Sequence, residues 1–381
     1  MIHYLCYCCA IFFALICLLL ATRLSAQAQT RKAYVSQSED KTTLTFYYDA
    51  LRATRTGTTW GIEETKKEGD IPVPAWAETW DVADYTTTAR VVFDASFRDF
   101  RPTTTAKWFN YCVALKQIEG LEYLNTSEVK DMSYMFSACK ALTSLDLKNF
   151  NTQNVTDMSR MFSDCITLTS LDQMNFNTQN VTNMSSMFSD CRTLTSLDLK
   201  NFNTQNVTDM SNMFFSCGRL TSLDLQHFNT QNVTNMDGMF FSCEALTSLD
   251  LQHFNTQNVT NMESMFYGCS ALTSLDLKHF NTKKVTDMYE MFSGCSALTS
   301  LDLKNFDTQY VTDMRRMFSG CAALTTINSN TTWWCPESEN MFADCTKLKG
   351  AVAYDKNKVD AKMANPETGY FTAKPTMVES R

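Results

Sequence analysis

The sequence predicts an α/β solenoid of about ten coils, each 26 residues long. The first observation is a series of ten cysteines that follow one another at intervals of 27, then 26 seven times, then 24 residues. They are Cys112, Cys139, Cys165, Cys191, Cys217, Cys243, Cys269, Cys295, Cys321 and Cys345. The second observation is that leucine, phenylalanine and methionine recur with the same period. A fixed period of this length indicates coils that stack on their neighbours and bury a continuous core.

One coil, residues 194–217, shows how each segment is expected to fold. It reads LTSLDLKNFNTQNVTDMSNMFFSC. From Leu194 to Leu199 the leucines have the L-x-x-L-x-L spacing of a leucine-rich repeat, in which alternate residues of a short strand point inward. A polar corner and a second extended segment follow. From Met210 to Cys217 the apolar residues are three or four positions apart, which predicts a short helix with one buried face.

The methionine and cysteine clusters admit two interpretations. Thioethers and a thiolate are the soft ligands that select copper(I), so Met158, Met161 and Cys165 could bind a metal. The cluster recurs in almost every coil, however, and methionine is a common filler of irregular cores. We therefore expect a core stripe with no metal site, and buried free thiols in place of disulfides. Cys335 lies outside the series, and it could pair with Cys345.

The two ends of the chain depart from the repeat. In residues 1–28 an apolar run followed by small residues predicts a signal peptide, although the run could also serve as an uncleaved anchor. Residues 29–88 are expected to form a β-rich N-terminal cap, residues 89–348 the solenoid, and residues 349–381 a C-terminal cap and tail. We expect an exported protein, secreted or at the cell surface, with no transmembrane domain in the mature chain.

Charge and motifs exclude several functions. The net charge is −8, whereas a nucleic-acid partner requires a basic face. The chain has no H-E-x-x-H, G-x-S-x-G or P-loop motif. We expect no enzyme and no bound cofactor, with calcium as the one weak possibility.

Stacking turns each outward position of the coil into a row along the solenoid, and three rows are candidate sites. An acidic row could hold calcium or a basic stretch of a partner, or it could be a solvated strand face that is partly neutralised by Lys148, Lys200, Lys278 and Lys304. It comprises Asp146, Asp172, Asp198, Asp224, Asp250, Asp276 and Asp302. A histidine row could bind a transition metal or respond to pH, or it could be a surface position that has drifted. It comprises His227, His253 and His279. An asparagine row at the corner is expected to bridge adjacent coils through its amides. It comprises Asn154, Asn180, Asn206, Asn232 and Asn258.

One coil carries a misfit. Where other coils read LDLKNF, residues 171–176 read LDQMNF, which places Gln173 at an inward position and Met174 at an outward one. Because a buried, unpaired amide costs about 1 to 3 kcal/mol, we predict a local bulge that turns Met174 inward.

The repeat unit LTSLDLxxFNTxNVTDMxxMFxxC resembles that of the BspA-like leucine-rich-repeat surface proteins of bacteria. The resemblance covers about residues 112–345, and NPETGYFT near the C-terminus resembles the usual exit from such repeats. It implies surface exposure or secretion, and adhesion to host matrix proteins such as fibronectin and fibrinogen, or to other bacteria. We therefore predict an adhesin-like protein with a protein or glycan ligand. The alternative is a structural surface-layer component without a host ligand.

Overall fold

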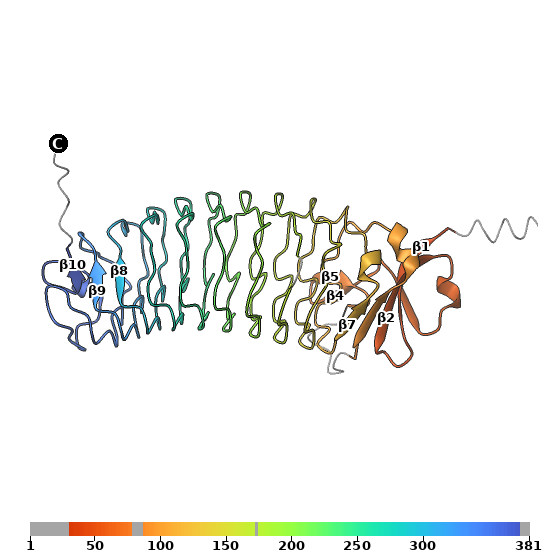
Figure 1. Ribbon diagram of the computed structural model, residues 1–381, viewed down its shortest axis with the longest axis horizontal. Helices are drawn as coiled ribbons and strands as arrows, with labels where there is room; N and C mark the ends of the chain where they lie inside the picture. Colours follow the sequence, from red (N-terminus) through yellow and green to blue (C-terminus); the bar gives the residue numbers. More distant parts are fainter. Residues whose placement is uncertain (1–29, 78–86, 172–173, 374–381) are drawn as a thin grey trace, which may run out of the picture.

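The computed structural model describes residues 30–77, 87–171 and 174–373, so the predicted signal peptide lies outside the described residues. Stacked coils form one elongated solenoid between a larger β-sheet at the N-terminal end and a smaller one at the C-terminal end (Figure 1). Within these ranges the helical elements are all short 3-10 turns, and none is long and apolar enough to cross a membrane. They are η1 (Arg52–Thr54), η2 (Ala95–Asp99), η3 (Leu121–Tyr123) and η4 (Ala361–Met363).

The N-terminal sheet has five strands in the order β3-β1-β2-β6-β7. Its members are β1 (Lys32–Gln37), β2 (Thr43–Asp49), β3 (Thr58–Gly61), β6 (Arg90–Phe93) and β7 (Gln117–Glu119). The first three strands pair antiparallel, whereas β2, β6 and β7 pair parallel, as stacked coils do. A separate antiparallel hairpin joins β4 (Thr65–Glu68) to β5 (Ile71–Pro74). The sheet therefore changes from hairpin pairing to the pairing of a solenoid.

Aromatic side chains continue the sheet's core into that of the coils. Phe46 on β2 stacks on Phe93 of β6, with ring centroids 4.6 Å apart, and on Trp108 at 5.2 Å. Phe109 then stacks on Phe136, and one buried phenylalanine per coil extends this stack to Phe342. Each ring covers the next, so the core is continuous along the solenoid.

The C-terminal sheet is parallel, in the order β10-β9-β8. It consists of β8 (Ser300–Asp302), β9 (Thr326–Asn328) and β10 (Phe371–Thr372). Tyr370 and Phe371 are fully buried, and their rings pack edge-on against Phe342, the last ring of the stack. The end of the chain thus covers the last part of the core.

The predicted short helix in each coil is wrong, because the segment is a series of turns bonded to the neighbouring coil. In the coil of residues 194–217 the amides of Met210, Asn212, Phe214 and Ser216 donate to carbonyls of the following coil, at 2.6 to 3.1 Å. The alternate amides, such as Met213 and Cys217, close turns on the carbonyl three residues back. Asn212 and Ser216 adopt left-handed backbone with φ of 56° and 55°. A helix would direct these amides along its own axis, whereas the turns join the coils and still place the apolar side chains inward.

Pairing between coils is unequal on their two sides. On the turn side, parallel bridges form an unbroken ladder from Thr104 to Glu337. On the leucine side, the pairing assigned among the described residues joins β6 to β7 and Ser144 to Ser170 near one end, and β8, β9 and β10 at the other. In the described part of the middle coils the leucine segments are not assigned as strands, although most of their leucines are buried. The continuous ladder therefore lies on the opposite side from the leucine-rich segment.

The cysteines are buried free thiols, as expected, and they also form hydrogen bonds. Cys165 Sγ donates to the carbonyl of Phe136 at 3.1 Å, and the later coils repeat this bond at 2.9 to 3.2 Å. Cys335 and Cys345 are not paired with each other, because their thiols donate to the carbonyls of Glu337 and Phe318. The predicted inward turn of Met174 is confirmed, since only 4% of it is exposed, whereas Gln173 lies outside the described residues.

Candidate binding surface

The acidic row on the leucine side is held by short local contacts. In each described coil one carboxylate oxygen accepts a hydrogen bond from the backbone amide two residues further on, at 3.0 to 3.4 Å. These carboxylates belong to Asp146, Asp198, Asp224, Asp250, Asp276 and Asp302, whereas Asp172 lies outside the described residues. The bond ends the leucine segment and starts the turn toward the next phenylalanine.

The side chain two residues on also contacts several of these carboxylates. Lys148 Nζ is 2.6 Å from Asp146, Lys200 Nζ is 2.6 Å from Asp198, and in two other coils a glutamine amide takes the place of the lysine. The lysine beside each holds the pKa of Asp146, Asp198 and Asp276 below its usual value. These three carboxylates are therefore held in their ionised form and are partnered at their own surface.

The histidine row lies beside the acidic row. His227, His253 and His279 are all exposed. No three His, Cys, Asp or Glu side chains of residues 30–77, 87–171 and 174–373 come together as a metal-binding group. The two rows thus lie next to each other without forming a metal-binding cluster in that part of the chain.

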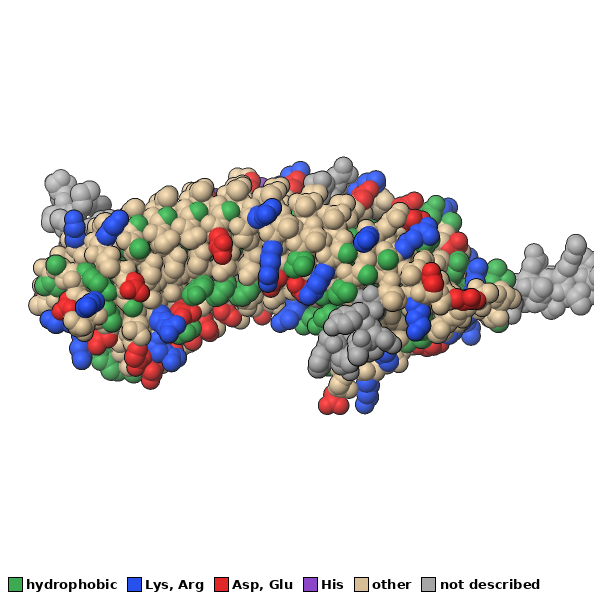
Figure 2. Space-filling model, turned by 90° about the horizontal axis from the view of Figure 1, so that it is seen from below, with side chains coloured by type: hydrophobic (Ala, Val, Ile, Leu, Met, Phe, Trp, Pro, Cys, Tyr) green, Lys and Arg blue, Asp and Glu red, His purple; other side chains and the backbone are tan. Residues whose placement is uncertain are grey.

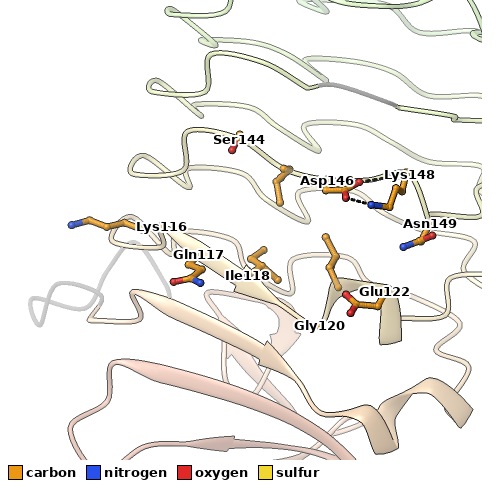
Figure 3. A pocket seen from close by; sticks show the side chains of 11 residues that line it. Lys116, Gln117, Ile118, Gly120, Glu122, Ser144, Asp146, Lys148 and Asn149 are labelled. Carbon is orange, nitrogen blue, oxygen red and sulfur yellow. Dashed lines mark hydrogen bonds and ion pairs between the residues drawn. The ribbon is translucent and has the colours of Figure 1, made fainter.

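A shallow pocket of about 570 Å³ lies at the N-terminal end of the acidic row (Figure 3). Its lining includes Lys116, Gln117 and Glu122 from the region of β7 and η3, and Asp146 and Lys148 from the coil that follows. In Figure 3 Asp146 and Lys148 face each other across their ion pair, and Glu122 lies on the opposite wall. The pocket combines both signs of charge, so it has no strong preference for an anion or a cation.

The asparagine row has the structural role predicted for it. Asn206 Nδ2 donates to the carbonyl of Gln179 in the preceding coil at 2.7 Å, and the other four asparagines repeat this bond. These amides hold the corners of adjacent coils together, which leaves them unavailable as a ligand-binding row.

A second exposed feature, on the turn side, was missed from the sequence. Phe215, Phe241 and Tyr267 are partly exposed and stack on one another, with centroids 4.3 and 4.4 Å apart. We call these three residues the aromatic strip. The signal was present in the sequence, because other coils carry serine or alanine at this position, as in Ser189 and Ser293. Only the positions that all coils share were considered in the sequence, so an aromatic residue found in three coils was not singled out.

The rings of the aromatic strip stack more closely than the buried rings of adjacent coils. Ring centroids of adjacent coils are 4.3 Å apart in the aromatic strip, 5.8 Å apart between the buried rings of Phe214 and Phe240, and 6.3 Å apart between Phe176 and Phe202. In Figure 2 the outline of the solenoid curves inward on one side, where hydrophobic side chains are bordered by acidic ones.

Stacked coils joined by backbone bridges, with rows of polar side chains on their surface, define a repeat solenoid protein. A family described as "Mycoplasma protein of unknown function, DUF285" matches residues 103–197, 184–284 and 247–356. These matches together cover about two thirds of the chain, and the protein belongs to this family. The predicted membership of a bacterial repeat family is therefore confirmed.

Three solved structures are similar at low identity. A leucine-rich repeat protein from Bacteroides ovatus is 16% identical, with 90% of this chain and 98% of that chain covered and a TM-score of 0.26. A leucine-rich cell surface protein from Faecalibacterium prausnitzii is 15% identical, with 89% and 97% covered and a TM-score of 0.27. A leucine-rich repeat protein from Eubacterium ventriosum is 15% identical, with 93% and 97% covered and a TM-score of 0.29. No curated protein matches the chain.

Proposed function

We propose that this protein is an exported, non-catalytic binding protein that presents its solenoid surface to a protein or glycan ligand, as an adhesin does. The supporting observation is how the coils are bonded. Between Asn212 and Phe241 the turn-side backbone amides are used within the coil or between coils. The outward side chains are therefore not needed for most of this bonding, and they form a long, repetitive surface for a partner.

We infer in addition that the stack contains about ten coils and that both ends are closed by nonrepeating segments. The antiparallel strands β1, β2 and β3 support this inference at one end, and Tyr370 and Phe371 support it at the other. Closed ends keep a solenoid from adding further strands or copies at its edges. A protein of this kind suits a life outside the cell as a single elongated particle.

The test is saturable binding of the purified protein to immobilised fibronectin, fibrinogen and a glycan panel, with and without calcium. Heat-unfolded protein is the control for nonspecific adsorption. Saturable binding to one ligand by the folded protein alone is the expected result. Binding that requires calcium would direct mutagenesis to Asp198 and Asp224 of the acidic row. No binding, together with concentration-dependent assembly in sedimentation, would replace this proposal with a structural surface-layer role.

A further inference from the structure

The aromatic strip is continuous with a group of carboxylates on the same side of the solenoid. A Cβ placed on Gly238 would lie 3.5 Å from Cδ2 of Phe215 and 2.4 Å from Oδ1 of Asn212. Asn212 Nδ2 in turn donates to Asp237 Oδ2 at 3.4 Å. Asp237 and Glu263 occupy the same position in successive coils. The residues two positions before them, Asn235 and Asn261, belong to the bridge ladder. In the coils on either side, the ladder position is occupied by Asp209 and Asp287. We call these four carboxylates the acidic border.

Few positive charges neutralise the acidic border. Among the described residues no ion pair includes Asp209, Asp237, Glu263 or Asp287, and Arg315, which offsets part of the repulsion at Asp287, is itself paired with Asp313. Burial, together with repulsion from other carboxylates, raises the pKa of Asp237, Glu263 and Asp287 above its usual value. The border is an accumulation of negative charge that a cation would relieve.

The arrangement of the rings decides which kind of cation fits. The rings of Phe215, Phe241 and Tyr267 are nearly parallel, at 11° and 10°, so each covers a face of its neighbour. Mainly the ring edges are left for a partner, whereas a sugar stacks on ring faces. Lysine and arginine have apolar stems that lie along such a surface while their charged ends reach carboxylates nearby.

We propose that the aromatic strip and the acidic border together form a docking surface for an extended segment of a partner protein that is rich in lysine and arginine. The inference rests on the proposed binding function and adds the face and the chemistry of the partner. The strip and the border repeat over successive coils, so an extended segment can lie along several of them.

The probe is a short fluorescent peptide of alternating lysine and threonine, titrated into the purified protein at low salt. A peptide of alternating glutamate and threonine is its counterpart. The variants are Glu263→Gln in the acidic border, Phe241→Ser in the aromatic strip, and the matched control Asp250→Asn. Asp250 lies in the same coil as Glu263, on the leucine side, and its substitution makes the same change of charge. Thermal unfolding establishes that each variant is folded.

We expect saturable binding of the lysine peptide that weakens with added salt, because exposed charges are screened. Glu263→Gln and Phe241→Ser should each weaken it about fivefold, and Asp250→Asn less than about twofold. No binding by the unmodified protein, equal binding of the glutamate peptide, or equal effects of Glu263→Gln and Asp250→Asn would overturn the proposal. Binding of cello-oligosaccharides that is lost in Phe241→Ser and kept in Glu263→Gln would assign the strip to a sugar instead.

The same variants separate this inference from the proposed function. Peptide binding at the strip by a protein that binds no member of the matrix and glycan panel would leave the docking surface and remove the adhesin role. If a matrix ligand binds and its binding survives both Glu263→Gln and Phe241→Ser, the adhesin role would stand and the docking surface would be rejected as its site.

Discussion

The hydroxyl of Thr204 accepts a hydrogen bond from the amide of Asn229 at 2.8 Å and donates one to the carbonyl of the same residue at 2.9 Å. Thr204 is fully buried, and equivalent threonines repeat this arrangement in most coils. A single side chain thus satisfies both polar backbone groups of a residue in the next coil. Threonine at this position is a bond between coils and is not simply part of a polar corner.

Thr204→Val should destabilise the protein by about 2 to 4 kcal/mol, because it keeps the shape of the side chain and leaves two backbone groups without a partner. Urea unfolding followed by circular dichroism measures the change. Thr208→Val is the matched control, since Thr208 is exposed and its hydroxyl donates at 3.2 Å to the carbonyl of Thr182, which the amide of Thr208 still reaches after the substitution. The control should stay within about 0.5 kcal/mol of the unmodified protein. Equal effects of the two substitutions would contradict the role of Thr204.

The thiols of the regularly spaced cysteines should resist chemical modification in the folded protein. Burial raises the pKa of Cys165, Cys217 and Cys269 to about 12, and at pH 8 a thiol with this pKa is ionised in roughly one molecule in ten thousand. Ellman's reagent should therefore label these thiols only after unfolding in urea. Cys335, the most exposed described cysteine at 6%, should react first. Rapid labelling of several thiols per folded molecule would show that the cysteine side of the core opens.

In the later coils glycine occupies the residue just before the cysteine, where the backbone is left-handed, as in Gly268, Gly294 and Gly320. Gly294 has φ of +75°, and a Cβ there would meet backbone atoms of Gly268 no closer than 3.4 Å. Gly294→Ala should therefore cost about 1 kcal/mol through backbone strain and not through a clash. Gly218→Ala, at a residue without positive φ and with its nearest neighbour atom 3.8 Å away, should change thermal stability little. The reverse order of the two melting temperatures would contradict the assigned strain.

Glu263 should make the protein less stable as pH rises, which is the opposite of the usual effect of a carboxylate. Its folded-state pKa is raised, first by burial and then by neighbouring carboxylates, so the folded state binds more protons than the unfolded state. The free energy of unfolding then falls as pH rises through this range. Glu263→Gln should stabilise the protein at pH 7, and the gain should disappear below about pH 4, near the ordinary pKa of glutamate.

Asp250→Asn is the control for this pH dependence, because Asp250 is exposed and bonded to Gln252. It should not reproduce the gain at pH 7. If Glu263→Gln destabilised the protein at neutral pH, the repulsion assigned to the acidic border would be wrong.

Periodicity was sufficient to predict the solenoid, the inward leucines and the buried thiols, because burial follows directly from the spacing of apolar side chains. The same spacing misled for Met210 to Cys217. Apolar residues three and four apart fit a helix, but they also fit paired turns whose left-handed residues return the chain inward. Sequence spacing reports which side chains are buried, whereas the bonds of the backbone depend on the neighbouring coil. The helix was therefore wrong although its buried face was right.

The rows of candidate site residues were likewise predictable only in part. The amide bonds of Asn206 and its equivalents followed from repetition alone. The charge of Lys200 beside Asp198 was also expected, and its Nζ is 2.6 Å from the carboxylate. The bond from the Lys200 amide to Asp198 was not expected, because it depends on the turn that the aspartate itself forms. The aromatic strip was missed because the repeat was described by the residues that all coils share. Phe215, Phe241 and Tyr267 stand where other coils have serine or alanine.

Adjacent coils are joined by a continuous bridge ladder on the turn side and by few backbone bonds on the leucine side, so the two sides should respond differently to force. Bonds between coils run along the length of the molecule, so a pull on its two ends, such as flowing liquid exerts on a tethered particle, acts directly along them. On the turn side several bonds at each junction carry the load side by side and must yield together, whereas between Leu199 and Leu225 no ladder bond is assigned. Under tension the leucine side would open first and the body would flex about its turn side before any coil separated.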